Sequence, residues 1–81
     1  MRLSDINDFV DEHRCYTRAH QRAFGCPPFA DSVQMPSASA LREAATLCDR
    51  PISSMTYDDG DGRRLSFEFR GVVFEFWGRE S

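Results

Sequence analysis

The chain lacks any long apolar run. No hydrophobic segment approaches the length of about 20 residues that a helix needs to cross a bilayer. Its first five residues also lack the apolar core of a signal peptide. We therefore expect a cytoplasmic protein with no membrane contact.

Cysteine and histidine are too few and too irregularly spaced for a disulfide framework or a metal motif. The odd number of cysteines, three, fits reduced thiols in a reducing compartment. His13 and His20 are two helical turns apart, about 10.5 Å, which is too far for both rings to bind one ion. We expect no metal and no cofactor.

Catalytic motifs are also missing. The sequence contains no nucleophile elbow, no phosphate-binding loop and no dinucleotide fingerprint. Cys15 shares a predicted helix with His13, but the two side chains would point about 200° apart. Asp58, Asp59 and Asp61 lack the spacing and the flanking helices of a calcium-binding EF-hand, so they favour a hairpin loop. We expect a protein that is not an enzyme.

Positive charge is too scarce overall to favour nucleic acid. The formal net charge is −3, which mildly favours a basic protein surface as partner. Three of the positive charges lie close together on the first predicted helix. Arg14, Arg18 and Arg22 recur every fourth residue and so follow one side of the helix, which we call the arginine ridge. Such a ridge could clamp phosphates, but without aromatic residues on the same face of the helix it is typical of a solvated helix face.

The last third of the chain has a strong strand pattern. Three strands are predicted at about 52–57, 63–69 and 72–77. A two-residue turn at Arg70-Gly71 aligns six apolar side chains on one face of the second hairpin. They are Leu65, Phe67, Phe69, Val72, Phe74 and Phe76. That face must be covered by other parts of the chain.

The register of the first hairpin is open between two alternatives. A five-residue loop, at 58–62 or 59–63, places Met55 and Tyr57 on the apolar face. A two-residue turn at 60–61 would instead place there Ile52, Ser54 and Thr56. We prefer the first alternative because it buries more apolar surface.

Two helices are predicted before the strands. The first spans residues 5–24, with Ser4 as N-cap and Gly25 as the stop signal. Its inward side is predicted to contain Ile6, Phe9, Val10, His13, Tyr16 or Thr17, His20 and Phe24. The second helix begins after Pro36, with Ser37 or Ser39 as N-cap, and ends near Asp49. Between the helices, residues 26–36 are predicted to form an ordered loop, with one helical turn at 29–34, whose apolar residues either plug the core or contact a partner.

This order predicts a single α+β domain over residues 1–81, with two helices packed on one face of a three-stranded antiparallel β-meander. The reverse face of the sheet, which the helices leave uncovered, would carry Arg64, Ser66, Glu68, Arg70, Val73, Glu75 and Trp77. Arg64 lies opposite Trp77, an arrangement that fits either an internal cation–π pair or an interface hot spot. The edge of the last strand favours pairing with a partner strand or with a second copy.

Residues 39–55 loosely resemble a helix-turn-helix, which would support binding to DNA. Asp49 would then occupy the tight turn where glycine is usual, and Pro51 would fall in the first turn of the recognition helix. A strand that starts at Ile52 accounts for the serine-rich and β-branched residues better.

Together these patterns predict a non-enzymatic protein-binding module, an inhibitor or regulator that acts by occupying a surface. The predicted contact residues are Arg64, Glu68, Glu75 and Trp77 on the reverse face, with Asp58, Asp59 and Asp61 in the acidic loop. The small size and acidity are typical of inhibitors that phages and other mobile elements direct against basic, nucleic-acid-handling complexes. The alternative is a small nucleic-acid-binding transcriptional regulator that uses the arginine ridge.

Overall fold

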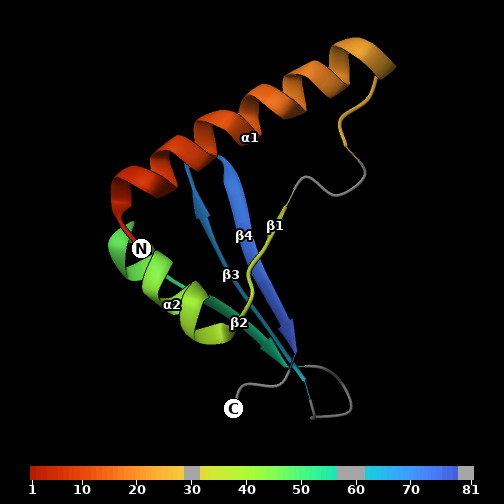
Figure 1. Cartoon of the computed structure of the whole chain (residues 1–81). Coiled ribbons are helices and arrows are strands. Elements are labelled where there is room, and N and C mark those ends of the chain that lie inside the picture. The colour runs from red at the N-terminus through yellow and green to blue at the C-terminus, as the bar shows by residue number, and fades with distance from the viewer. Residues whose placement is uncertain (29–31, 57–61, 79–81) are drawn as a thin grey trace.

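Two helices lie on one side of a four-stranded mixed sheet in the computed structural model, which describes residues 1–28, 32–56 and 62–78 (Figure 1). In chain order the elements are α1 (Leu3–Phe24), β1 (Val33–Gln34), α2 (Ala38–Leu47), β2 (Ser53–Thr56), β3 (Arg63–Phe69) and β4 (Val72–Gly78). The predicted α+β class is confirmed, as is the antiparallel run β2-β3-β4.

The sheet has one more strand than the sequence predicts. β1 pairs in parallel with β4, so that Val33 lies opposite Phe74 and Gln34 opposite Glu75, and the strand order is β1-β4-β3-β2. The backbone N–H of Met35 extends this pairing by donating to the carbonyl of Glu75 at 2.8 Å. The prediction of a three-stranded, purely antiparallel sheet is therefore wrong. The prediction that the last strand is an edge available to a partner strand or to a second copy is wrong as well, because β1 pairs with that side of β4. A strand of two residues is too short to display the alternation by which strands are recognised in a sequence.

The β3–β4 hairpin has the predicted register. Phe69 lies opposite Val72 and Leu65 opposite Phe76, while the rings of Phe67 and Phe74 stack with their centroids 4.9 Å apart. The turn residues Arg70 and Gly71 have φ values of 53° and 81°. Positive φ at both central positions is typical of the tight turn that matches the twist of paired strands.

β2 pairs in a register that neither alternative described. Ser54 lies opposite Leu65 and Met55 opposite Arg64, so Met55 faces the reverse side of the sheet. The preferred prediction, with Met55 on the covered face, is wrong. The second alternative assigns Met55 to the correct face, but it would place Thr56 opposite Leu65, where the structure has Ser54. Tyr57 and the other residues up to 61 lie outside the described residues. Ile52 packs against the core in place of Met55, so the covered face still receives an apolar side chain from this part of the chain.

The helix boundaries differ from the predicted ones at two of four ends, the start of α1 and the end of α2, and Ser37 is the N-cap of α2 as one of the two alternatives predicted. α1 begins at Leu3, two residues early, so Ser4 lies inside the helix and the prediction that it is the N-cap is wrong. α1 ends at Phe24, where Gly25 adopts φ 74° as the stop signal predicted. At the start of α2 the Ser37 Oγ accepts the backbone N–H of Ala40 at 3.1 Å, and α2 ends at Leu47.

The core lies between the helices and the covered face of the sheet. It contains Ile6 and Val10 of α1, Leu41, Ala44 and Ala45 of α2, and Leu65, Phe67, Val72 and Phe74 of the sheet. Val33 and Met35 pack against it, as expected if this segment plugs the core. The predicted helical turn at 29–34 is wrong for Val33 and Gln34, which form β1, and residues 29–31 lie outside the described residues. Phe29 lies outside the described residues.

Only the first half of α1 contributes to this core. Its 22 residues give a length of about 33 Å, and it crosses the ends of β3 and β4 instead of running along them (Figure 1). The overlap is therefore limited by the width of the four-stranded sheet, about 15 Å for strands about 4.8 Å apart. The second half of α1 therefore runs past the sheet (Figure 1), and Tyr16 and Phe24 are 59% and 71% exposed. The prediction that Phe24 faces inward is wrong because the helix extends beyond the surface it covers. Of the two alternatives for the preceding turn, Tyr16 is exposed and Thr17 is half-buried, so only Thr17 fits the inward side.

Candidate functional site

Glu75 is the centre of a polar network on the reverse face of the sheet. Its side chain comes from the middle of β4 and is buried, although both helices lie on the opposite side. Its Oε1 accepts hydrogen bonds from Ser32 Oγ at 2.9 Å and from Gln34 Nε2. Its Oε2 accepts from Arg64 Nε at 3.1 Å and Nη2 at 2.9 Å. The carboxylate thereby connects the segment around β1 to the central strand β3.

These contacts keep Glu75 ionised. Burial raises the pKa of the carboxyl group, but hydrogen bonds from Ser32, Trp77, Arg64 and Gln34 act in the opposite direction and together hold it below its usual value. Both oxygens are used inside the chain. The structure therefore places Glu75 as a residue that positions Arg64, and not as a free acid on the surface.

Arg64 is held from two sides. The fork of its guanidinium faces the Glu75 carboxylate, and its Cζ lies 5.3 Å from the centroid of the Trp77 ring. An arginine in this position loses little side-chain freedom on binding, because a charged pair and an aromatic surface already fix it. Arg64 and Trp77 therefore form a rigid unit, as their cross-strand pairing predicts.

Met55 extends this unit across the sheet. It lies opposite Arg64 on one side, as Trp77 does on the other, which gives a Met–Arg–Trp row across β2, β3 and β4. Met55 is 61% exposed and Trp77 47% exposed. Met55 was not predicted as a contact residue, because the preferred register assigns it to the covered face. The second alternative for the first hairpin places Met55 on the reverse face, where the structure has it.

The other residues predicted on the reverse face or in the acidic loop do not belong to the Met–Arg–Trp row. Glu68 is exposed on the same face, and its carbonyl accepts a hydrogen bond from Arg50 Nε at 2.8 Å. Arg70 was expected on the reverse face, but it lies in the turn, where its Nη2 donates to Asp11 Oδ1 of α1 at 2.7 Å. Asp58, Asp59 and Asp61 lie outside the described residues.

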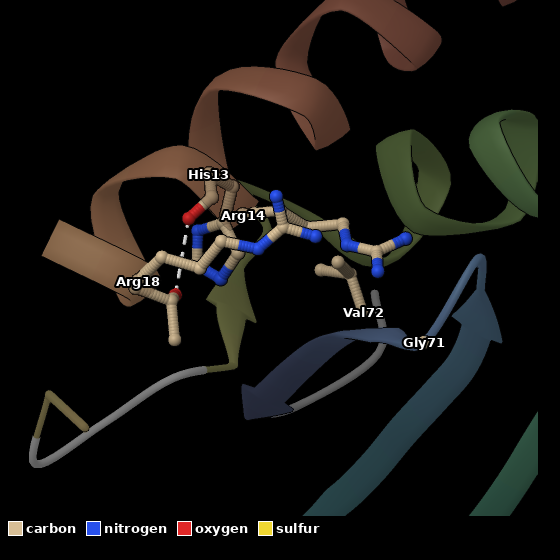
Figure 2. A pocket seen from close by; sticks show the side chains of 6 residues that line it. His13, Arg14, Arg18, Gly71 and Val72 are labelled. Atoms are coloured by element: carbon tan, nitrogen blue, oxygen red, sulfur yellow. Dashed lines mark hydrogen bonds between the residues drawn. The ribbon is translucent and has the colours of Figure 1, made fainter. Parts of the chain in front are cut away.

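Two members of the arginine ridge line hollows between α1 and the β3–β4 turn. In Figure 2, Arg14 and Arg18 extend from α1 over Gly71 and Val72, around a hollow of about 210 Å³. A second hollow, of about 320 Å³, is lined by the same two arginines together with Arg70, Asp11 and Cys15. Arg22 lies one turn further along α1 and lines neither of them.

An apolar groove lies at the other end of α1. It has a volume of about 290 Å³ and is lined by Met1, Asp5, Ile6, Phe9, Val33, Gln34, Met35, Ala44 and Phe74. Phe9 marks the point where the groove meets the exposed side of α1, since its ring lies 6.1 Å from Phe74 and 6.0 Å from His13. The groove combines residues from α1, β1, α2 and β4, which is why the sequence pattern did not reveal it.

Comparison with protein-family models, with curated proteins and with solved structures finds no match. None of the described helices is both long and apolar enough to cross a membrane. Among the described residues, no three histidine, cysteine or acidic side chains form a group able to hold a metal ion.

Proposed function

We propose that this chain is a non-enzymatic protein-binding module that acts by occupying a surface of its partner. The observation that carries the proposal is the Met–Arg–Trp row on the face of the sheet opposite to the helices, in which Met55 and Trp77 are exposed and Arg64 is held between Glu75 and the Trp77 ring. Tryptophan and arginine dominate interface energetics more often than other residues, and methionine adapts its shape to irregular partner surfaces.

The partner we propose has an apolar centre with a basic rim. The guanidinium of Arg64 is already neutralised by Glu75, so the row offers mainly apolar and aromatic surface. Glu68 lies on the same face, and Asp58, Asp59 and Asp61 follow β2 in the sequence, close to Met55. Negative charge around an apolar centre steers association toward positive surfaces. Basic proteins that handle nucleic acid have such surfaces, which fits an inhibitor of the size class encoded by phages and other mobile elements.

A capture experiment with matched variants tests this proposal. Tagged wild-type protein and the Met55→Ala/Trp77→Ala double variant are incubated with host lysate, and bound proteins are identified by mass spectrometry. We expect a basic partner that the wild type retains and the double variant loses, with affinity reduced at least about tenfold when it is measured with purified partner.

The control is Gln21→Ala, an exposed position on α1 that is remote from the row. It should retain the partner fully, and the melting temperature of the double variant should stay within a few degrees of wild type. If the double variant stays folded and binds the partner as tightly as wild type does, the row is not the contact surface.

A nucleic-acid-binding regulator is the second candidate, and one observation favours it. Arg14 and Arg18 line a common hollow with Arg70, whose guanidinium is paired with Asp11, and the two guanidinium groups of the arginine ridge favour a phosphate group as ligand. A gel shift at low and at high salt distinguishes this candidate. Phosphate contacts by these arginines should give retardation that salt abolishes, and an Arg14→Ala/Arg18→Ala variant should remove it. Absence of retardation at low salt excludes this candidate.

A further inference from the structure

Two members of the arginine ridge carry positive charge that no carboxylate neutralises in the part of the chain that the structure describes. Arg64 is paired with Glu75 and Arg70 with Asp11, whereas Arg14 and Arg18 have no such partner there. Arg14 donates from Nη1 to the carbonyl of Arg70 at 3.4 Å. A guanidinium has five N–H donors, so most of those on Arg14 remain available to a ligand.

The fold holds these two arginines over the β3–β4 turn. Arg14 and Arg18 are one helical turn apart on α1, and in Figure 2 both side chains extend in the same direction, over Gly71 and Val72. The turn itself is fixed to α1 by Arg70, whose Nη2 donates to Asp11 Oδ1 at 2.7 Å. The spacing between the two arginines and the turn is therefore set by contacts that do not use either arginine's charge.

The hollow of about 210 Å³ between α1 and the turn has no acidic residue in its wall. Its lining consists of His13, Arg14, Thr17, Arg18, Gly71 and Val72. The second hollow differs, because Asp11 contributes to its wall. The first hollow is smaller than the pockets of about 300–1,000 Å³ that enclose drug-sized ligands. It therefore suits a compact anionic group and not the whole of a large ligand.

We propose that this hollow binds the phosphate group of a phosphate monoester, which Arg14 and Arg18 hold from α1. A guanidinium donates two parallel hydrogen bonds to a pair of phosphate oxygens. A monoester carries a charge of about −1.5 to −2 at neutral pH, which matches the two positive charges of the hollow. A carboxylate or a phosphate diester has only one negative charge and would leave part of that positive charge unbalanced.

The charge around the hollow favours a single phosphate group over a nucleic acid strand. A strand would have to continue along the helix surface, where Asp8, Asp11 and Glu12 lie on the first half of α1. The net charge of −3 also disfavours a long polyanion. The proposal shares its phosphate chemistry with the second candidate function but differs in the ligand. It does not depend on the Met–Arg–Trp row, which lies on the other face of the sheet.

A titration of ¹⁵N-labelled protein with ethyl phosphate, followed by NMR at constant ionic strength, tests the proposal. We expect saturable shifts of the backbone amides of Gly71 and Val72 and of the side-chain Nε–H groups of Arg14 and Arg18. The variants Arg14→Gln and Arg18→Gln should each bind at least about tenfold more weakly, because each loses a charged hydrogen-bond donor.

The matched control is Arg22→Gln, which removes the same charge from the same helix but lines neither hollow. All three arginines are exposed, so the variants should keep the wild-type melting temperature within a few degrees. Arg22→Gln should bind ethyl phosphate like wild type; an equal loss in all three variants would indicate a response to net charge and overturn the proposal. Wild type without saturable shifts overturns it as well, and so do shifts at Cys15 and Arg70 that leave Gly71 and Val72 unchanged.

Three further ligands test the selectivity for a monoester. Diethyl phosphate, a diester with a single charge, should bind at least about tenfold more weakly than ethyl phosphate. Equal binding of the two would overturn the selectivity. Glucose 6-phosphate and a phosphoserine peptide present the same monoester from a metabolite and from a protein; binding of either supports the proposal and identifies the source, and failure of both overturns it.

A short oligonucleotide without terminal phosphates separates the proposal from the second candidate function. We expect it to bind more weakly than ethyl phosphate. Tighter binding of the oligonucleotide than of every monoester would overturn the proposal in favour of a nucleic-acid-binding regulator. None of these outcomes affects the capture experiment, because that experiment alters only Met55 and Trp77.

Discussion

The two faces of the sheet are both partly buried, but by different means. On the covered face, Leu65, Phe67 and Phe74 lose contact with water under two helices. On the reverse face, Ser66 and Glu75 are equally inaccessible, yet only side chains of the sheet and its flanks surround them. The covered face is stabilised by apolar area, which is additive and independent of pH. The reverse face depends on one charge and on four hydrogen-bond donors.

The difference has a consequence for function. The covered face is packed against the helices, so its side chains cannot contact a partner. The polar network on the reverse face is small, so the larger side chains of that face, Met55 and Trp77, stay exposed. The network also fixes Arg64 between a carboxylate and an aromatic ring. Such an arrangement suits a binding surface, because the ordering of the side chains has already occurred in the free protein.

The largest expected effect is on the covered face. Leu65→Ala removes a side chain that is almost completely inaccessible and leaves a cavity between the sheet and α2. We expect the free energy of unfolding to fall by about 2–5 kcal/mol, measured by urea denaturation. Met55→Ala is the matched control on the reverse face and should change it by less than about 0.5 kcal/mol. Similar losses in the two variants would contradict the distinction between the faces.

The second effect is on the polar network. Glu75→Gln keeps the shape of the side chain but removes the charge that holds Arg64, so we expect a loss of about 1.5–3 kcal/mol in the free energy of unfolding at neutral pH. Urea denaturation at constant salt measures it. A loss below about 0.5 kcal/mol, the level of an ordinary surface substitution, would mean that the reverse face does not depend on this charge.

The pH dependence sharpens this test. The pKa of Glu75 in the folded protein lies below its usual value of 4.5, so its contribution to stability is fully present above that value. The contribution disappears as the pH falls through the folded-state pKa, because the carboxyl group must then be protonated. The difference between wild type and Glu75→Gln should therefore be constant near neutrality and shrink in acid. Leu65→Ala should show a pH-independent difference over the same range.

The smallest effect is expected for Trp77→Ala. The exposed indole contributes a cation–π contact to Arg64, so its loss should lower the free energy of unfolding by only about 0.5–1 kcal/mol. The melting temperature, compared with that of Leu65→Ala, measures this effect. A loss as large as that of Leu65→Ala would place Trp77 among the residues that hold the fold together, and not among those left available for a partner.

Much of the sheet could be predicted from the sequence, for local reasons. Arg70-Gly71 is a turn whose geometry is decided by two residues, and once it is fixed, the alternation from Leu65 to Phe76 assigns every side chain to a face. The end of α1 is also determined locally, by Gly25, which adopts a positive φ directly after the last helical residue. The register of the first hairpin could not be predicted, because either face of β2 could be the buried one. The sequence of the turn does not distinguish the two registers.

The candidate site could be predicted only in part. The pairing of Arg64 with Trp77 followed from the hairpin register, whereas the inclusion of Met55 required the correct register of β2. The role of Glu75 could not be predicted, because Ser32 and Gln34 reach it only through β1. These two residues lie about forty positions before Glu75, and no local pattern connects them.

The sequence by itself determined the strands of the last hairpin, the end of α1 and the α+β class, because alternation, turn chemistry and helix stop signals act between neighbouring residues. The tertiary structure alone decided that β1 joins the sheet, that Glu75 is enclosed and that α1 extends past the sheet. Those features depend on the relative lengths of elements and on contacts between distant segments. The same contacts leave the second half of α1 and the Met–Arg–Trp row as two separate exposed surfaces.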